Sequence, residues 1–193
     1  MIPGIELNRV VDQNKKIHPH KFALWVGIGA IVMMFAGLTS AYIVKREQPG
    51  WTSFVMPIAF YYSLAVMLIS SVTIFLAGKS FRDRRMIRYR KLVGATAILG
   101  LVFVLLQFLG FRQLWLSGIS LHGSGAGQFL YIIAGLHGLH VLGGVIALLT
   151  LWLRVGNTRI RSYNMVPVEV VSTYWHFVDL LWVYLFIFFF MVQ

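Results

Sequence analysis

The chain has 193 residues, of which 59% are hydrophobic, and its mean hydropathy is +0.77. Soluble domains are closer to half apolar, so this composition excludes an ordinary soluble protein and favours several membrane spans. A formal net charge of +11 would suggest a nucleic-acid partner in a soluble protein. Here the basic residues lie between apolar segments, where they set membrane topology and face anionic headgroups, so a nucleic-acid partner is excluded.

Five apolar segments are each long enough to cross a hydrocarbon core of about 30 Å as a helix. Short polar connectors separate them, and no apolar run before a small-residue cleavage site indicates a signal peptide. We predict an all-α membrane protein, a single domain over residues 1–193 that forms a bundle of five transmembrane helices. The predicted spans are residues 22–44, 54–77, 92–116, 129–153 and 170–192.

Lysine and arginine are unequally divided between the two sides of these spans. Of the 17 such residues, 14 lie on the side of the N-terminus and 3 on the opposite side. Short loops rich in Lys and Arg stay in the cytoplasm, so we predict the N-terminus inside and the C-terminus outside.

The tryptophans fit the same layout. Three lie near predicted inner ends and two near outer ends, as in an interfacial belt; these are Trp25, Trp152, Trp175, Trp51 and Trp115. Trp182 alone lies in the middle of a span, so we expect it to pack against protein.

The last span carries an acid and an imidazole, Asp179 and His176, three residues apart and therefore on one helical face. A charged acid at this depth costs at least about 2.5 kcal/mol, so other helices must supply partners. His137 and His140 share a face of the preceding span, and Gln107 lies at a similar depth in the third. We predict one buried polar layer of these five side chains, with Asp179 hydrogen-bonded to a histidine of the fourth span.

This polar layer admits three interpretations. The favoured one is structural, because every polar group inside a membrane needs a partner but few need an ion. Three histidines and a carboxylate could also hold zinc or iron, but the paired carboxylates of di-iron bundles are missing. A proton relay is the third interpretation. His137 and His140 are one turn apart, which disfavours stacked haems, and the absence of cysteine excludes thiolate ligands and thiol nucleophiles.

Two further features concern packing and charge. Glycines on the first and fourth spans predict close helix approach; they are Gly27, Gly29, Gly37, Gly135, Gly138, Gly143 and Gly144. The basic connector over residues 79–91 is interpreted first as a topology anchor. Its arginines are also candidates for binding lipid headgroups or an acidic partner; they are Arg82, Arg84, Arg85 and Arg88.

Four stretches form a recognisable set: residues 70–73 (SSVT), 99–103 (LGLVF, leading to Gln107), 135–141 (GLHGLHV) and 174–179 (YWHFVD). Together they resemble subunit III of the haem-copper cytochrome c oxidases, in its short five-helix bacterial form, over nearly all of residues 22–193. The chain departs from the family at Gly110, where a glutamate is common, and near Ile31, where the family often has a carboxylate.

The resemblance implies a subunit of an oxidoreductase that has no catalytic centre and no cofactor of its own. Haem and copper are expected on a partner, subunit I, beside which this chain would support oxygen reduction and proton uptake. Further partners would be other oxidase subunits, larger respiratory assemblies and membrane lipids, including bound phospholipid, in a bacterial plasma membrane. The alternatives are the related subunit of a quinol oxidase or nitric-oxide reductase, or an independent membrane transporter.

Overall fold

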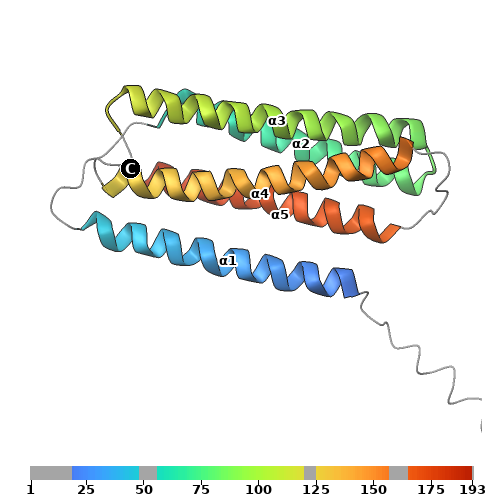
Figure 1. Ribbon diagram of the computed structural model, residues 1–193, viewed down its shortest axis with the longest axis horizontal. Helices are drawn as coiled ribbons and strands as arrows, with labels where there is room; N and C mark the ends of the chain where they lie inside the picture. Colours follow the sequence, from blue (N-terminus) through green and yellow to red (C-terminus); the bar gives the residue numbers. More distant parts are fainter. Residues whose placement is uncertain (1–18, 48–55, 120–124, 157–164, 193) are drawn as a thin grey trace, which may run out of the picture.

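The computed structural model describes residues 19–47, 56–119, 125–156 and 165–192, and nearly all of them are helical. The helices are α1 (Pro19–Arg46), α2 (Ile58–Arg82), α3 (Met86–Leu116), α4 (Gly125–Gly156) and α5 (Met165–Val192). They lie side by side along the long axis of the molecule (Figure 1). All five are long and apolar enough to cross a membrane, which confirms the predicted five-helix membrane protein.

The basic connector over residues 79–91 is mostly helical. Only Asp83, Arg84 and Arg85 separate α2 from α3. The stretch contains neither proline nor glycine, so the helices continue past the ends of the apolar runs. α2 ends at Arg82, just before Arg84 adopts the left-handed conformation.

Four helices form the core of the bundle, and the fifth lies at its edge. α2 packs on α3 and α5, and α4 packs on the same two helices. Among the described helices α1 packs only on α4 and α5, and Figure 1 shows it along the lower edge, away from α2 and α3. A hydroxyl pair, Thr39 and Tyr184 at 3.0 Å, and an ion pair, Lys21 and Glu169 at 2.6 Å, attach α1 to α5.

Buried positions recur every seven residues along each core helix. Examples are Phe60, Met67 and Ile74 on α2, Tyr89, Thr96 and Phe103 on α3, and Trp175, Trp182 and Phe189 on α5. A seven-residue repeat is the mark of left-handed helix bundles, in which each side chain packs between those of the facing helix. The outward faces are apolar as well, with Leu105, Phe108 and Leu180 more than 60% exposed, as expected of surfaces that face lipid or protein.

Trp175 is fully buried where four helices meet, which corrects its assignment to the interfacial belt. Its indole lies in a slot between Gly100 of α3 and Gly144 of α4. A Cβ atom added at Gly100 would lie 2.6 Å from the ring, and one added at Gly144 would lie 2.9 Å from it. The indole Nε1–H donates a hydrogen bond to Ser70 Oγ of α2 at 3.1 Å.

Only part of the expected set of glycines allows close approach between helices. A Cβ atom at Gly135 or Gly138 would meet nothing within 4 Å, and the same holds for all three glycines named on α1. Of the predicted set only Gly144, and more weakly Gly143, contacts a neighbouring helix. Glycine composition does not show which glycines lie against a neighbouring helix, and in this chain Gly135 and Gly138 do not.

The two ends of the bundle differ in charge among the described residues. Nine basic residues lie at the end where α2 turns into α3, namely Lys21, Lys79, Arg82, Arg84, Arg85, Arg88, Arg90, Lys91 and Arg154, and three lie at the other, namely Lys45, Arg46 and Arg112. Ends of membrane proteins that are rich in Lys and Arg stay in the cytoplasm. This difference in charge therefore predicts that the end where α2 turns into α3 lies inside.

The orientation can be tested with single cysteines, since the chain has none of its own. Cysteines at Glu47 and Ser117 should react with an impermeant maleimide in intact cells. Cysteines at Arg85 and Arg154 should react only after the cells are opened. If Arg85→Cys is labelled in intact cells and Glu47→Cys is not, the orientation is the reverse of the predicted one.

A second prediction concerns the slot around Trp175. Gly100→Ala forces the indole or Val145 to move, because the added methyl lies 2.6 and 2.7 Å from them, and overpacking of this kind costs about 1–3 kcal/mol. The midpoint of thermal unfolding in detergent should fall for Gly100→Ala. Gly138→Ala, which places the same methyl in open space, is the control and should not lower it; equal midpoints for both variants would show that the slot does not hold the bundle.

Candidate functional site

Polar side chains of α2 pair with those of α3 and α5 along the middle of the bundle. We call these four pairs the polar ladder. The pairs are Ser63 with Gln107 at 3.0 Å, Ser70 with Trp175 at 3.1 Å, Ser71 with His176 at 2.7 Å, and Thr73 with Thr96 at 2.8 Å. Each pair joins two helices, so the ladder fixes α2 against both neighbours.

The chemistry of two rungs follows from the serine hydroxyl. Ser63 donates its proton to the Phe60 carbonyl at 2.8 Å, and Ser70 donates to the Met67 carbonyl at 2.7 Å. Each oxygen then has lone pairs left but no proton, so its partner across the helix interface must be a donor. The Gln107 amide and the Trp175 indole N–H meet this requirement.

The five residues predicted as one polar layer are spread along the bundle. Gln107 lies level with Ser63 and His176 lies level with Ser71, eight residues further along α2, which corresponds to about 12 Å. The prediction of a single layer is therefore wrong. The similar depth expected for these five residues was counted from the ends of the apolar runs. That count is too coarse, because α4 and α5 begin four and five residues before the predicted spans.

Asp179 is 4% exposed, and neither carboxyl oxygen makes a hydrogen bond with a described residue. The Ser71 hydroxyl interacts with this carboxyl, but at a geometry that does not form a hydrogen bond. The expected hydrogen bond to a histidine of α4 is thus absent. The Asp179–His176 face of α5 meets α2 at Ser71, and a shared helical face alone could not show which neighbour it meets.

His137 and His140 differ in their surroundings although they share a helix. His137 is fully buried, and its ring stacks on that of Trp182 at 4.9 Å, with no hydrogen bond from either ring nitrogen to a described residue. The Phe103 ring makes edge-to-face contacts with both rings, at centroid distances of 5.6 and 5.2 Å. His140 is half-buried and its Nδ1 bonds the Leu136 carbonyl of its own helix at 2.7 Å.

Gly110 marks the place where the resemblance leads one to expect an acid. A Cβ atom at Gly110 would lie 3.0 Å from the ring of Phe60, which also stacks on Trp182 at 5.9 Å. An aromatic ring therefore occupies the space beside α3 at this position. A glutamate here would require Phe60 to move.

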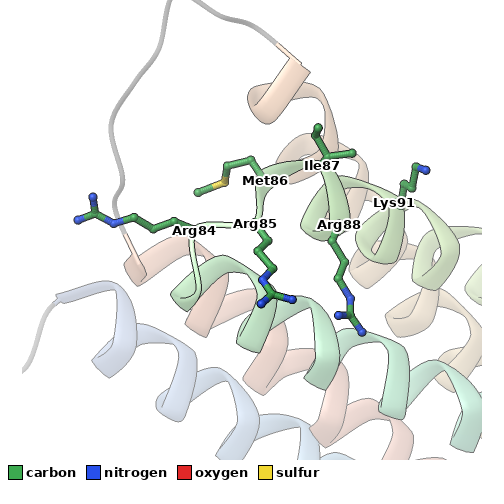
Figure 2. Close-up of a pocket in the computed structure, with 6 residues that line it drawn as sticks. All are labelled: Arg84, Arg85, Met86, Ile87, Arg88 and Lys91. Atoms are coloured by element: carbon green, nitrogen blue, oxygen red, sulfur yellow. The ribbon is translucent and has the colours of Figure 1, made fainter.

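The four candidate arginines surround the turn between α2 and α3. A pocket of about 640 Å³ opens beside the first turn of α3 and is lined by Arg84, Arg85, Met86, Ile87, Arg88 and Lys91 (Figure 2). Arg82 lies at the end of α2 and lines a different hollow, together with Lys21 and Glu169.

These features define what the site can do. Within the described part of the chain, no group of three or more His, Asp and Glu residues is placed to hold a metal ion. Gln107, Trp175 and His176 are engaged in contacts between helices, whereas Asp179 and His137 are buried without hydrogen bonds to described residues. The sequence pointed to these polar residues, and the motif over residues 70–73 contained Ser70 and Ser71, but it did not show that these serines are their partners. Ser63 was missed, although its seven-residue spacing from Ser70 along α2 was the available signal.

Known proteins share this sequence over nearly its whole length. The family described as cytochrome c oxidase subunit III matches residues 52–193. A probable cytochrome c oxidase subunit 3 of Mycobacterium tuberculosis is 34% identical over 182 residues, covering 89% of this chain and 90% of the relative. The cytochrome c oxidase subunit 3 of Bacillus sp. (strain PS3) is 29% identical, with coverage of 84% and 80%. A probable quinol oxidase subunit 3 of Staphylococcus epidermidis is 27% identical, with coverage of 94% and 92%. The chain is an integral membrane protein that belongs to the cytochrome c oxidase subunit III family, and thus to the subunits of haem-copper oxidases.

Proposed function

We propose that this chain is a subunit without a catalytic centre, which packs beside the haem- and copper-bearing subunit I of a terminal oxidase in a bacterial plasma membrane. Haem and copper belong to the partner in this proposal, and this chain supports oxygen reduction and proton uptake there. Other oxidase subunits, and the larger respiratory assemblies that they form, are its further partners.

The polar ladder is the observation that carries this proposal. The glutamine and histidine side chains of the interior are the groups that would bind a resident cofactor. Two of them, Gln107 and His176, are instead hydrogen-bonded to serines of α2. Hydrogen bonds between helices serve a rigid scaffold, since in membranes each contributes about 0.6 kcal/mol on average and several together fix register. A scaffold of this kind suits a subunit that holds its place against another.

A quinol oxidase is the second candidate. It is favoured by the relative named as a probable quinol oxidase subunit 3, which matches 94% of this chain. The same scaffold would serve either enzyme, because the electron donor binds elsewhere in both proposals.

The proposal is tested by purifying the complex through a tag on this chain, in mild detergent. We expect a haem-copper subunit to co-purify, with haem absorbance and copper in constant ratio to the tagged chain. Oxygen consumption with reduced cytochrome c or with a quinol then separates the two candidates. A purified assembly without haem, or a metal that stays with the isolated chain, would contradict the proposal, and substrate flux in liposomes that contain this chain alone would favour a transporter.

Asp179 provides a sharper prediction. Its carboxyl group makes no hydrogen bond with a described residue, and the neighbouring Ser71 keeps its hydrogen bond to His176 when Asp179 is replaced. Asp179→Leu therefore leaves no group without a partner, and it removes the cost of burying an unpaired polar group. Both Asp179→Leu and Asp179→Asn should therefore keep the subunit in the complex and leave oxygen consumption per haem unchanged.

The matched control for this prediction is Ser71→Ala. It removes the partner of His176, so the subunit should be lost more readily during purification, by an amount that reflects about 0.6–1.7 kcal/mol. If oxygen consumption falls in Asp179→Asn while the subunit is fully retained, Asp179 carries protons and the structural assignment fails.

A further inference from the structure

The turn between α2 and α3 places three cations around one small pocket. This basic pocket is about 250 Å³ in volume and is lined by Leu76, Lys79, Ser80, Asp83, Arg85 and Arg88. Asp83 is its only acid, and none of the three cations makes a salt bridge with a described residue. The pocket therefore has a surplus of two positive charges without an internal counter-ion.

The backbone of the turn aims two of these cations in the same direction. Arg84 adopts the left-handed conformation, with φ of 57°, at the position where a helix end usually has glycine. The N–H groups of Arg84 and Arg85 donate to the carbonyls of Phe81 and Ser80, at 3.1 and 2.9 Å, which closes α2 and starts α3 directly afterwards. Figure 2 shows the side chains of Arg85 and Arg88 extending together, whereas those of Arg84 and Lys91 diverge.

The depth of the pocket relative to the membrane indicates which kind of ligand it binds. Leu76 lies within the apolar run of α2, Lys79 follows three residues later, and Arg88 lies four residues before Leu92, where the apolar run of α3 begins. At about 1.5 Å per residue, the three cations lie within roughly two helical turns of the hydrocarbon, which is the depth of phospholipid headgroups. Leu76 thus lies on the side of the pocket nearer the hydrocarbon and the three cations lie nearer the surface, in the same order as an acyl chain followed by a phosphate.

We infer that the basic pocket binds the phosphate of an anionic phospholipid from the adjacent leaflet, held by Arg85 and Arg88 with Lys79 beside them. Guanidinium groups suit this task because their planar fork donates two hydrogen bonds to one phosphate. Pockets for drug-sized ligands measure about 300–1,000 Å³, so this smaller pocket holds a headgroup and leaves the acyl chains against the outer faces of α2 and α3. A topology anchor needs only charge somewhere in the connector, whereas a lipid site needs these two arginines.

The test compares two double variants of the full chain that lose the same charge. Arg85→Gln/Arg88→Gln empties the pocket of its arginines. Arg84→Gln/Arg154→Gln removes two charges from the same end of the bundle but outside the basic pocket. Native mass spectrometry of each protein in detergent, titrated with phosphatidylglycerol and separately with phosphatidylcholine, measures the bound lipid.

Wild type and Arg84→Gln/Arg154→Gln should bind phosphatidylglycerol equally and in preference to phosphatidylcholine. Arg85→Gln/Arg88→Gln should bind it about 30-fold more weakly, from two lost contacts of about 1 kcal/mol each. Arg85→Lys/Arg88→Lys, which keeps the charge but loses the fork, should fall between them, and it serves as the test if the Gln variant does not fold.

Four results would overturn the inference. Equal binding by all variants would exclude the pocket, and equal weakening by both Gln variants would leave only a general charge effect. Full displacement of phosphatidylglycerol by millimolar inorganic phosphate would identify a site for free anions instead. An acidic protein that is lost from the Arg85→Gln/Arg88→Gln preparation, with lipid binding unchanged, would assign the pocket to that protein.

Discussion

The indole of Trp175 is the contact on which the rest of the bundle depends. Lipid tails are as apolar as leucine, so helices in a membrane gain little by burying apolar surface, and close packing with hydrogen bonds must hold them together. Trp175 supplies both at one place, because its ring fills the slot between Gly100 and Gly144 while its N–H bonds Ser70. A single side chain of α5 thereby sets the position of three other helices.

The polar ladder extends this constraint along α2. Small serines allow a neighbour to approach, and the hydroxyls of Ser63 and Ser70, after donating to their own helix, accept from the neighbouring one. At these two rungs the partner must therefore be a donor as well as fit the space. Asp179 and His137 lie outside this scheme, since both are buried but neither makes a hydrogen bond with a described residue. Their burial is a cost that the packing of the neighbouring helices must offset.

The sequence alone predicts the features that depend on large free energies of transfer from water to lipid. Five apolar runs were bound to become five spans, and the carboxyl group of Asp179 and the amide of Gln107 were bound to face inward, as they do. The pairing of these groups could not be predicted, because the inner and outer faces of a membrane helix are equally apolar and no amphipathic pattern shows which neighbour a face meets. Trp175 shows the difficulty: a tryptophan near the end of an apolar run suits an interfacial belt equally well, and only the glycines of two other helices place it in the core.

The peripheral position of α1 has a consequence for the order in which the protein is built. Helices enter the membrane as they are synthesised, N-terminal first, so α1 arrives before either of the helices on which it packs. The Thr39 hydroxyl can bond that of Tyr184 only after Tyr184, 145 residues further along the chain, has been synthesised. Until then α1 must persist in the bilayer as a solitary span, supported by its own hydrophobicity and its internal backbone hydrogen bonds.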